Sequence, residues 1–330
     1  MPNLTPQTIW KLTPPELQTL LDTGNLKSTS NTIHFYAPSF TFYKTKHFCS
    51  STKEFPTISV TGNRCALNCK HCGGKVLETM QPAQSPQALF ELAVKLKAEG
   101  AKGVLVSGGC LPDGSVPLDD FAAVLGRIKL ELELTVFVHT GFVRGESAFA
   151  LKKAGVDAAL IDVLGSEETV QNAFNLKVSV RDYADSLKAL TEAHLNVVPH
   201  VIVGLNGGIL DGELHALEII KQNSTPQAIV IIAFMPIHGT EMVNTPPPKP
   251  SDIAKVAAAA RQMFSHTPLV LGCMRPKGKQ REETDVLALK AGVDGVAFPS
   301  EKAIEYTKNS GFQTVFSPYC CAQVGLDVER

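Results

Sequence analysis

The stretch Gly103-Val-Leu-Val-Ser-Gly-Gly-Cys110 begins as a short β-branched run and ends in two glycines before a cysteine. The segment 118–130 that follows has apolar residues three and four positions apart, a spacing typical of an amphipathic helix. The same succession of apolar run, loop and helical segment recurs along the chain. Because strands joined through helices return in the same direction, the repetition predicts a parallel sheet with crossover helices.

Eight such strands are predicted, at 57–60, 103–107, 134–139, 158–161, 196–203, 228–234, 269–272 and 295–299. Eight parallel strands alternating with helices are what a (β/α)8 barrel requires, so we predict an α/β fold of TIM-barrel type, closed or incompletely closed. A doubly wound open sheet also fits, because the repeat does not report closure. In both arrangements, reactive groups are expected in loops at the carboxyl ends of the strands.

The predicted barrel occupies residues 55–300 and has an additional segment on each side. Residues 1–54 form an N-terminal extension, with a short helix near 15–22 and a hairpin or extended arm over the aromatic stretch 32–48. Residues 301–330 form a C-terminal segment that carries two adjacent cysteines.

The composition narrows the class of function. The 330 residues have a formal net charge of -1 and scattered basic residues, which argues against a nucleic-acid partner or an anionic membrane surface. Neither a signal-like apolar segment nor a run long enough to span a bilayer is found, so we expect a soluble cytoplasmic protein. Eight cysteines in a reducing compartment indicate metal binding or catalysis more than a disulfide framework.

Three of these cysteines lie close together in Cys65-Ala-Leu-Asn-Cys69-Lys-His-Cys72, in the loop after the first barrel strand. Three soft thiolates within eight residues can hold one face of an iron–sulfur cubane and leave its fourth iron open. A structural zinc site and a redox-active Cys-x-x-Cys pair are the alternatives. Zinc would need a fourth ligand nearby, and His71 lies too close between two cysteines to bind the same ion without strain.

The Cys-x3-Cys-x2-Cys spacing in this loop resembles the signature of the radical S-adenosylmethionine (SAM) superfamily. Gly108-Gly109-Cys110 resembles the family's Gly-Gly-Glu motif, whose backbone meets the methionine amino group, although Cys110 departs from the acidic residue. His71 occupies the position that packs near the adenine. The resemblance implies a four-iron four-sulfur (4Fe–4S) cluster on Cys65, Cys69 and Cys72, bound SAM, and reductive cleavage of SAM to a 5′-deoxyadenosyl radical.

Further segments resemble the biotin synthase branch of this family and preserve its motif order. They are 201–208, which contains Gly204 and Asn206, and Met235-Pro-Ile-His-Gly-Thr240. Asp162 at the end of the fourth strand resembles an aspartate that contacts cofactor and substrate, and helix capping is its structural alternative. His139 is expected to line the cavity, whereas His200, within a strand, is expected more often to be a core residue.

The segment Leu271-Gly-Cys273-Met-Arg275 resembles a biotin synthase segment whose arginine belongs to a second, sacrificial iron–sulfur cluster. We therefore predict Arg275 as a catalytic residue. Cys273, Cys320 and Cys321 are the favoured ligands of a second cluster, ahead of Cys49 and Cys110, and a role as buried small hydrophobes is the alternative for each. Sulfur insertion at an unactivated carbon is then the expected reaction.

The block Tyr36-Ala-Pro-Ser-Phe40, followed by the strand and cysteine loop, resembles the larger component of the two-component lipoyl synthases. This resemblance implies an octanoyl chain on a carrier-protein domain as substrate, a paralogous radical SAM partner chain and a low-potential electron donor. The alternatives are biotin synthase-like insertion into a free small molecule, a radical rearrangement without a second cluster, and a non-enzymatic zinc-binding protein.

Overall fold

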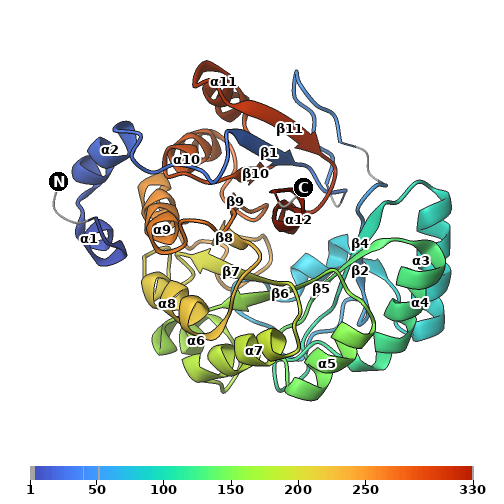
Figure 1. The fold of residues 1–330 in the computed structure, drawn as a ribbon. Helices are drawn as coiled ribbons and strands as arrows, with labels where there is room; N and C mark the ends of the chain where they lie inside the picture. Colours follow the sequence, from blue (N-terminus) through green and yellow to red (C-terminus); the bar gives the residue numbers. More distant parts are fainter. Residues whose placement is uncertain (1–3, 40, 51–52, 329–330) are drawn as a thin grey trace.

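One parallel sheet dominates the computed structural model, which describes residues 4–39, 41–50 and 53–328. Its eleven described strands curl into an open barrel in the order β11-β1-β10-β9-β8-β7-β6-β5-β4-β2-β3, and the pairings between them are parallel (Figure 1). The strands are β1 (Thr32–Tyr36), β2 (Thr57–Ser59), β3 (Gln81–Pro82), β4 (Gly103–Ser107), β5 (Thr135–His139), β6 (Ala158–Val163), β7 (Val197–Val203), β8 (Ile229–Ala233), β9 (Leu269–Leu271), β10 (Gly295–Ala297) and β11 (Gln313–Ser317).

The α/β barrel prediction is confirmed in its incompletely closed form. All eight predicted strands are present as β2 and β4 to β10, and they follow one another in sequence order across the sheet. Such an order has no switch point, which excludes the doubly wound alternative. Within the described residues, β3 and β11 end the sheet without pairing to each other.

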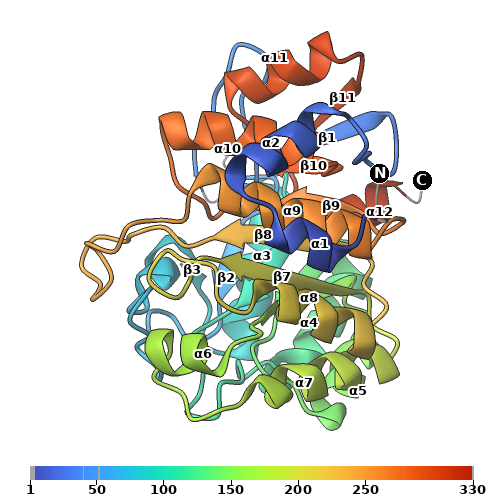
Figure 2. The same ribbon diagram turned by 90° about the vertical axis from the view of Figure 1, so that its left-hand side faces the viewer.

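Helices cover the outer face of the curled sheet, while the carboxyl ends of the strands carry the longer loops (Figures 1 and 2). Their apolar faces are buried against the strands, as in α7, where Tyr183, Leu187 and Leu190 lie below a Ser179–Asp182 capping box. The helices are α1 (Pro6–Lys11), α2 (Pro14–Asp22), α3 (Pro86–Ala98), α4 (Ala122–Leu132), α5 (Gly145–Lys153), α6 (Glu167–Ala173), α7 (Val180–Glu192), α8 (Glu213–Asn223), α9 (Pro250–Met263), α10 (Lys279–Lys290), α11 (Glu301–Asn309) and α12 (Val324–Val328), with 3-10 helices η1 (Lys75–Thr79), η2 (Asp119–Phe121) and η3 (Cys321–Gln323).

The N-terminal extension contributes a strand to the sheet. Strand β1 runs parallel between β10 and β11, so residues 32–36 take the extended form of the prediction and do not form a hairpin. A single antiparallel bridge between Lys44 and Cys49 is the nearest approach to a hairpin in this segment. The sheet therefore includes strands from all three predicted parts of the chain.

After β11 the chain turns inward, and α12 lies within the curve of the sheet (Figure 1). Cys321, Ala322 and Val324 are buried among inward-facing strand residues such as Phe137 and Val198. The buried Tyr36 hydroxyl donates to the Asp327 carboxylate at 2.8 Å and ties the end of this segment to β1. The C-terminal cysteines are thereby carried into the interior of the barrel.

Within the described residues, none of the helices combines the length and the apolar character that crossing a membrane would need.

Candidate active site

A cavity of about 420 Å³ lies inside the curve of the sheet. The loop after β2, the carboxyl ends of β4 to β9 and the C-terminal segment all contribute to its wall. Most of the described residues that line it are apolar, and they include one carboxylate, Asp162, but neither lysine nor arginine. A second cavity of about 450 Å³ lies beside α5 and α7, but no cysteine or histidine is among the residues that line it. The candidate metal ligands thus converge on the first cavity.

Cys65, Cys69 and Cys72 all line this cavity, as the sequence predicts for the first cluster. The loop is held in a tight turn, because the Gly73 N–H donates to the Cys69 carbonyl at 2.7 Å. The Cys69 thiol donates to Cys72, which lowers the pKa of Cys72 to about 4 and raises the pKa of Cys69. Thiolates are the form that binds iron, so this loop has the right donor chemistry for a cluster.

The glycine pair after β4 packs directly against the cysteine loop. The Gly109 N–H donates to Thr61 Oγ1 at 2.7 Å, and a Cβ atom on Gly109 would lie only 2.6 Å from the Cβ of Cys65. Gly108 is also close, with an ideal Cβ 3.1 Å from the Thr61 side chain. The pair is therefore needed for close approach of two backbones, and both glycines line the cavity.

Cys110 lies beside Cys65, a contact that the sequence does not predict. Its thiol donates to Cys65 and lowers the pKa of Cys65 to about 5, while its own pKa is raised. Its carbonyl also accepts from the Ala66 N–H at 2.8 Å. Cys110 therefore belongs to the first group of thiols, in place of the acidic residue of the resembled motif.

His71 points toward the same space, with its ring 5.0 Å from that of Phe174. Its Nδ1 atom lies 3.5 Å from the Ala173 carbonyl oxygen. Burial alone would lower the pKa of His71, but the hydrogen bond to Cys72 and the charge of that thiolate outweigh burial and raise it. His71 and Phe174 together present flat apolar surfaces beside the cysteine loop.

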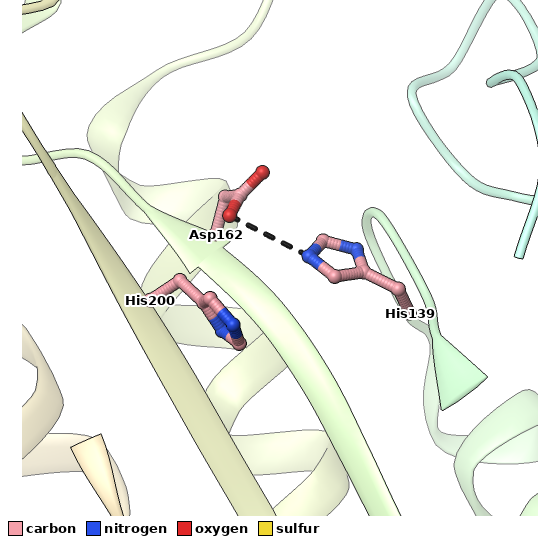
Figure 3. A group of neighbouring side chains, drawn as sticks. All are labelled: His139, Asp162 and His200. Carbon is pink, nitrogen blue, oxygen red and sulfur yellow. Dashed lines mark ion pairs between the residues drawn. The ribbon is translucent and has the colours of Figure 1, made fainter. Parts of the chain in front are cut away.

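Three polar side chains from consecutive strands also meet at this cavity: His139 at the end of β5, Asp162 in β6 and His200 in β7 (Figure 3). His139 Nε2 lies 3.5 Å from Asp162 Oδ1, and the two histidine rings are 5.4 Å apart. Their ligating atoms lie within 4.8 Å of one another. The sequence predicts His139 and Asp162 at the cavity but not His200. His200 lies there because its position in β7 pairs with Asp162 in the neighbouring parallel strand β6.

The charges of this group are strongly coupled. Burial opposes ionisation of both partners, yet the Asp162 carboxylate raises the pKa of His139, and His139 in turn holds the pKa of Asp162 below its usual range. Burial and the charge of His139 lower the pKa of His200 to about 4, so its imidazole is neutral at pH 7. One ring is thus paired with a carboxylate, and the other is an uncharged nitrogen donor.

Cys273, Cys320 and Cys321 also come together at the cavity. Cys321 donates to Cys320 and lowers the pKa of Cys320, while burial and the nearby Cys320 raise the pKa of Cys273 to about 11. Cys49 does not join them, because it is exposed in the 44–49 loop and does not line the cavity. The eight cysteines therefore divide into two groups at one cavity and one isolated residue.

Arg275 lies in a buried hydrogen-bond network. Its side chain is fully buried and is engaged by Asp285 Oδ1 at 2.8 Å and by the carbonyl oxygens of Gly272 and Phe298 at 2.6 and 3.3 Å. It is absent from the wall of the cavity, where Cys273 and Met274 stand. These contacts hold the guanidinium in a buried network, and a role of Arg275 at a second cluster stays a prediction.

The loop after β7 also differs from the expectation. Gly204 has φ +72°, and a Cβ atom there would contact Pro248, so the glycine permits close packing of two loops. The Asn206 amide donates to Asp211 at 3.1 Å and accepts from Asn172 at 3.3 Å. Neither residue lines the cavity, whereas Leu205 between them does. Any contact of Gly204 or Asn206 with a cofactor stays a prediction.

Comparison with known proteins gives a direct match for the part of the chain that holds the cysteine loop. Residues 59–213 match the family model described as the radical SAM superfamily. The match spans a little under half of the chain and makes it similar to that superfamily. A member of that superfamily would hold a 4Fe–4S cluster and SAM, and the three thiols of the β2 loop fit such a cluster in number and chemistry.

The relatives of this chain include biotin synthases. That of Zymomonas mobilis is 24% identical over 263 residues, covering 76% of each chain, and that of Gloeobacter violaceus is 26% identical over 242 residues, covering 70% of this chain and 73% of the relative. Among solved structures, methylornithine synthase has a TM-score of 0.60 at 14% identity and covers 97% of both chains. The FeFe-hydrogenase maturase HydG from Carboxydothermus hydrogenoformans has a TM-score of 0.61 at 14% identity, covering 93% of this chain and 74% of its own. These structures support the fold.

Proposed function

We propose that this radical SAM enzyme inserts sulfur at an unactivated carbon, and that its substrate is an octanoyl chain carried on a protein domain, as in a lipoyl synthase. The observation that carries the proposal is the presence of two groups of thiols on one apolar cavity, four around the β2 loop and three at Cys273, Cys320 and Cys321. When bound, the first cluster supplies the electron that cleaves SAM to a radical, and the second supplies sulfur.

The chain's own residues support these roles in different ways. The first cluster would be held by Cys65, Cys69 and Cys72. Their loop is fixed by the close packing of Gly109 against Cys65 and by its hydrogen bond to Thr61. His71 would offer its ring face to the adenine of SAM. Cys273, Cys320 and Cys321 would hold the second cluster. The apolar wall between the two groups keeps water away from a reactive carbon radical.

The lining also favours an aliphatic acyl group over a free acid. Neither lysine nor arginine is among the described residues that line the cavity. The histidines with raised pKa values, His71 and His139, already face Cys72 and Asp162, so a buried free carboxylate would have to compete for them. An octanoyl group joined to a carrier lysine is an amide and carries no such charge. This argument supports a protein-bound substrate; a paralogous partner chain and a low-potential electron donor remain proposals from the resemblance alone.

The first experiment is anaerobic quantitation of iron and sulfide in the wild type and in a Cys65→Ala, Cys69→Ala, Cys72→Ala triple variant, with deoxyadenosine release measured on the same samples. We expect about eight irons in the wild type and about four in the triple variant, with release from the wild type alone. Octanoylated carrier domain and free octanoate are then compared as substrates. About four irons in the wild type and none in the variant would instead indicate radical chemistry without a second cluster.

A further inference from the structure

Three side chains of metal-binding type that the proposed function does not use meet at the cavity. They are His139, Asp162 and His200, and one ligand atom from each lies within 4.8 Å of the other two. Two imidazoles and one carboxylate form a donor set that suits divalent transition metals such as zinc and ferrous iron.

The sheet holds these three side chains on one face. His200 in β7 is paired with Asp162 in β6. His139 in β5 is paired with Leu160, which shares a face of β6 with Asp162 because the two are separated by two positions. All three candidate ligands line the cavity, and Figure 3 shows the His139 ring facing the Asp162 carboxylate with the His200 ring beside it. Neighbouring strands thus present the three donors to a common space.

The spacing of these donors is close to that of ligands on one ion. Two ligand atoms that each lie about 2.1 Å from a shared ion are about 3.0–3.5 Å apart. His139 Nε2 and Asp162 Oδ1 are 3.5 Å apart. The donor of His200 lies no more than 4.8 Å from either of the others, so a side-chain rotation that moves it by about 1–2 Å would complete the set.

Asp162 lacks the partners that a buried carboxylate normally has. Its Oδ1 atom is buried and makes no hydrogen bond to the described residues, although His139 is near. It is the one carboxylate among the described residues that line the cavity, and neither lysine nor arginine lines it. Buried charges in proteins are paired or coordinate metals. A divalent ion between Asp162 and the two histidines would supply the missing cation.

His200 is held in the form that can bind a metal. Its Nδ1 lies 3.1 Å from the Val198 carbonyl oxygen, and because a carbonyl can only accept, Nδ1 carries the proton. The lone pair of the neutral ring is then on Nε2. Histidines that bind metals commonly donate their other ring N–H to a backbone carbonyl, which fixes the tautomer and the orientation of the ring.

We propose that His139 Nε2, Asp162 and His200 Nε2 bind one divalent transition-metal ion that is separate from the iron–sulfur clusters. Three protein ligands leave at least one coordination position free, and this position would face the cavity that all three residues line. It would take a water molecule or an oxygen atom of the substrate, such as the amide carbonyl of a carrier-bound acyl chain. The ion site itself does not rest on the second cluster.

His47 provides a matched control outside the cavity. Its Nε2 atom lies 3.7 Å from Glu301 Oε2, and this carboxylate oxygen is also buried without a hydrogen-bond partner among the described residues. On the other side of the ring, Lys308 Nζ lies 3.0 Å from His47 Nδ1. The pair reproduces the His139–Asp162 contact but has a cation in place of a second histidine, so we expect it to bind no divalent ion.

The probe is Co²⁺, which accepts the same ligands as zinc and whose unpaired electrons report on them. Anaerobic holoenzyme, with its clusters in the oxidised, diamagnetic state, is titrated with Co²⁺, and bound Co²⁺ is measured by equilibrium dialysis and electron paramagnetic resonance. We expect about one bound Co²⁺ per chain, with a nitrogen coupling that changes when histidine alone is labelled with ¹⁵N. At equal iron and sulfide content, His139→Gln, Asp162→Asn and His200→Gln should each weaken binding by about tenfold or more, whereas His47→Gln should leave it unchanged.

The absence of a bound ion, or a Co²⁺ signal that histidine labelling leaves unchanged, would overturn the proposed site. Binding that survives all three cavity substitutions, or that is lost with His47→Gln, would also overturn it. The labelling needs no substitution, so it is decisive even if a variant fails to fold. The titration is then repeated with SAM: retention of Co²⁺ supports the site, whereas displacement of Co²⁺ by SAM would assign Asp162 to the cofactor instead. Iron and sulfide counts test the second cluster separately, so either proposal can fail alone.

Discussion

Glu213 should make the stability of this protein fall as the pH rises through neutrality. It is the first residue of α8, its side chain is buried, and one carboxyl oxygen accepts the Gly204 N–H at 2.8 Å. The other carboxyl oxygen is buried without a hydrogen-bond partner. Burial outweighs the hydrogen bonds and raises the pKa of Glu213 to about 7, compared with an ordinary 4.5. The group is thus neutral in the folded protein under conditions in which it ionises in the unfolded chain.

The sign of the effect follows from proton binding. Between pH 4.5 and about 7 the folded state binds more protons at this site than the unfolded state, so the free energy of unfolding falls with rising pH. One pKa unit corresponds to about 1.4 kcal/mol. The full loss is therefore about 3 kcal/mol, and between pH 5 and pH 8 it amounts to about 2–3 kcal/mol.

The assay is urea unfolding of the wild type and Glu213→Gln at pH 5 and pH 8. Glutamine keeps the acceptor for Gly204 and cannot ionise, so the variant should gain about 2–3 kcal/mol relative to the wild type on going from pH 5 to pH 8. Glu168→Gln, at an exposed position on α6, controls for the general loss of a carboxylate and should show no such gain. A difference between wild type and Glu213→Gln that is the same at both pH values would refute the reasoning.

Two further predictions concern the cysteine loop and the buried arginine. Gly109→Ala should destabilise the protein by about 1–3 kcal/mol and lower its iron content, because the new Cβ atom would overlap Cys65. The control in the same unfolding and iron assays is Gly145→Ala, whose new Cβ atom has no neighbour within 4 Å. Arg275→Met should cost about 3–5 kcal/mol in urea unfolding because Asp285 loses its buried partner, yet iron per folded protein should stay constant. A selective loss of iron in that variant would instead support Arg275 as a cluster ligand.

The repeating part of the fold could be predicted because its signals are local. Each strand from β2 to β10, apart from the two-residue β3, is marked by its own apolar run and bounded by a helical segment. The place of β1 could not be predicted in this way, because Thr32–Tyr36 pairs with Gly295–Ala297 and Gln313–Ser317, more than 250 residues later in the chain. No local pattern in the aromatic stretch 32–48 specifies parallel partners at the other end of the chain.

The candidate site likewise has one part that local sequence predicts and another that depends on the fold. The spacing of Cys65, Cys69 and Cys72 lies within one loop, so the sequence suffices to bring them together. The wall with His200 depends on the register of neighbouring strands, in which His200 lies opposite Asp162. A histidine within an apolar run looks like a core residue until that register is known. Arg275 was placed by resemblance, and its buried pairing could not be predicted because its partner, Asp285, comes from a helix that the motif does not include.

The C-terminal segment links stability to the second group of thiols, and this determines how the group can be tested. Cys321, Ala322 and Val324 cover inward-facing apolar residues that include Phe137 and Val198, which would otherwise face the interior of an open barrel. Truncation after β11 would expose this surface as well as remove two thiols, so a loss of activity could not be attributed to the missing ligands. Single Cys→Ser changes keep the packing and remove one candidate ligand at a time. Single Cys→Ser changes are therefore the informative perturbation, because they leave the C-terminal segment in place within the inner apolar cluster.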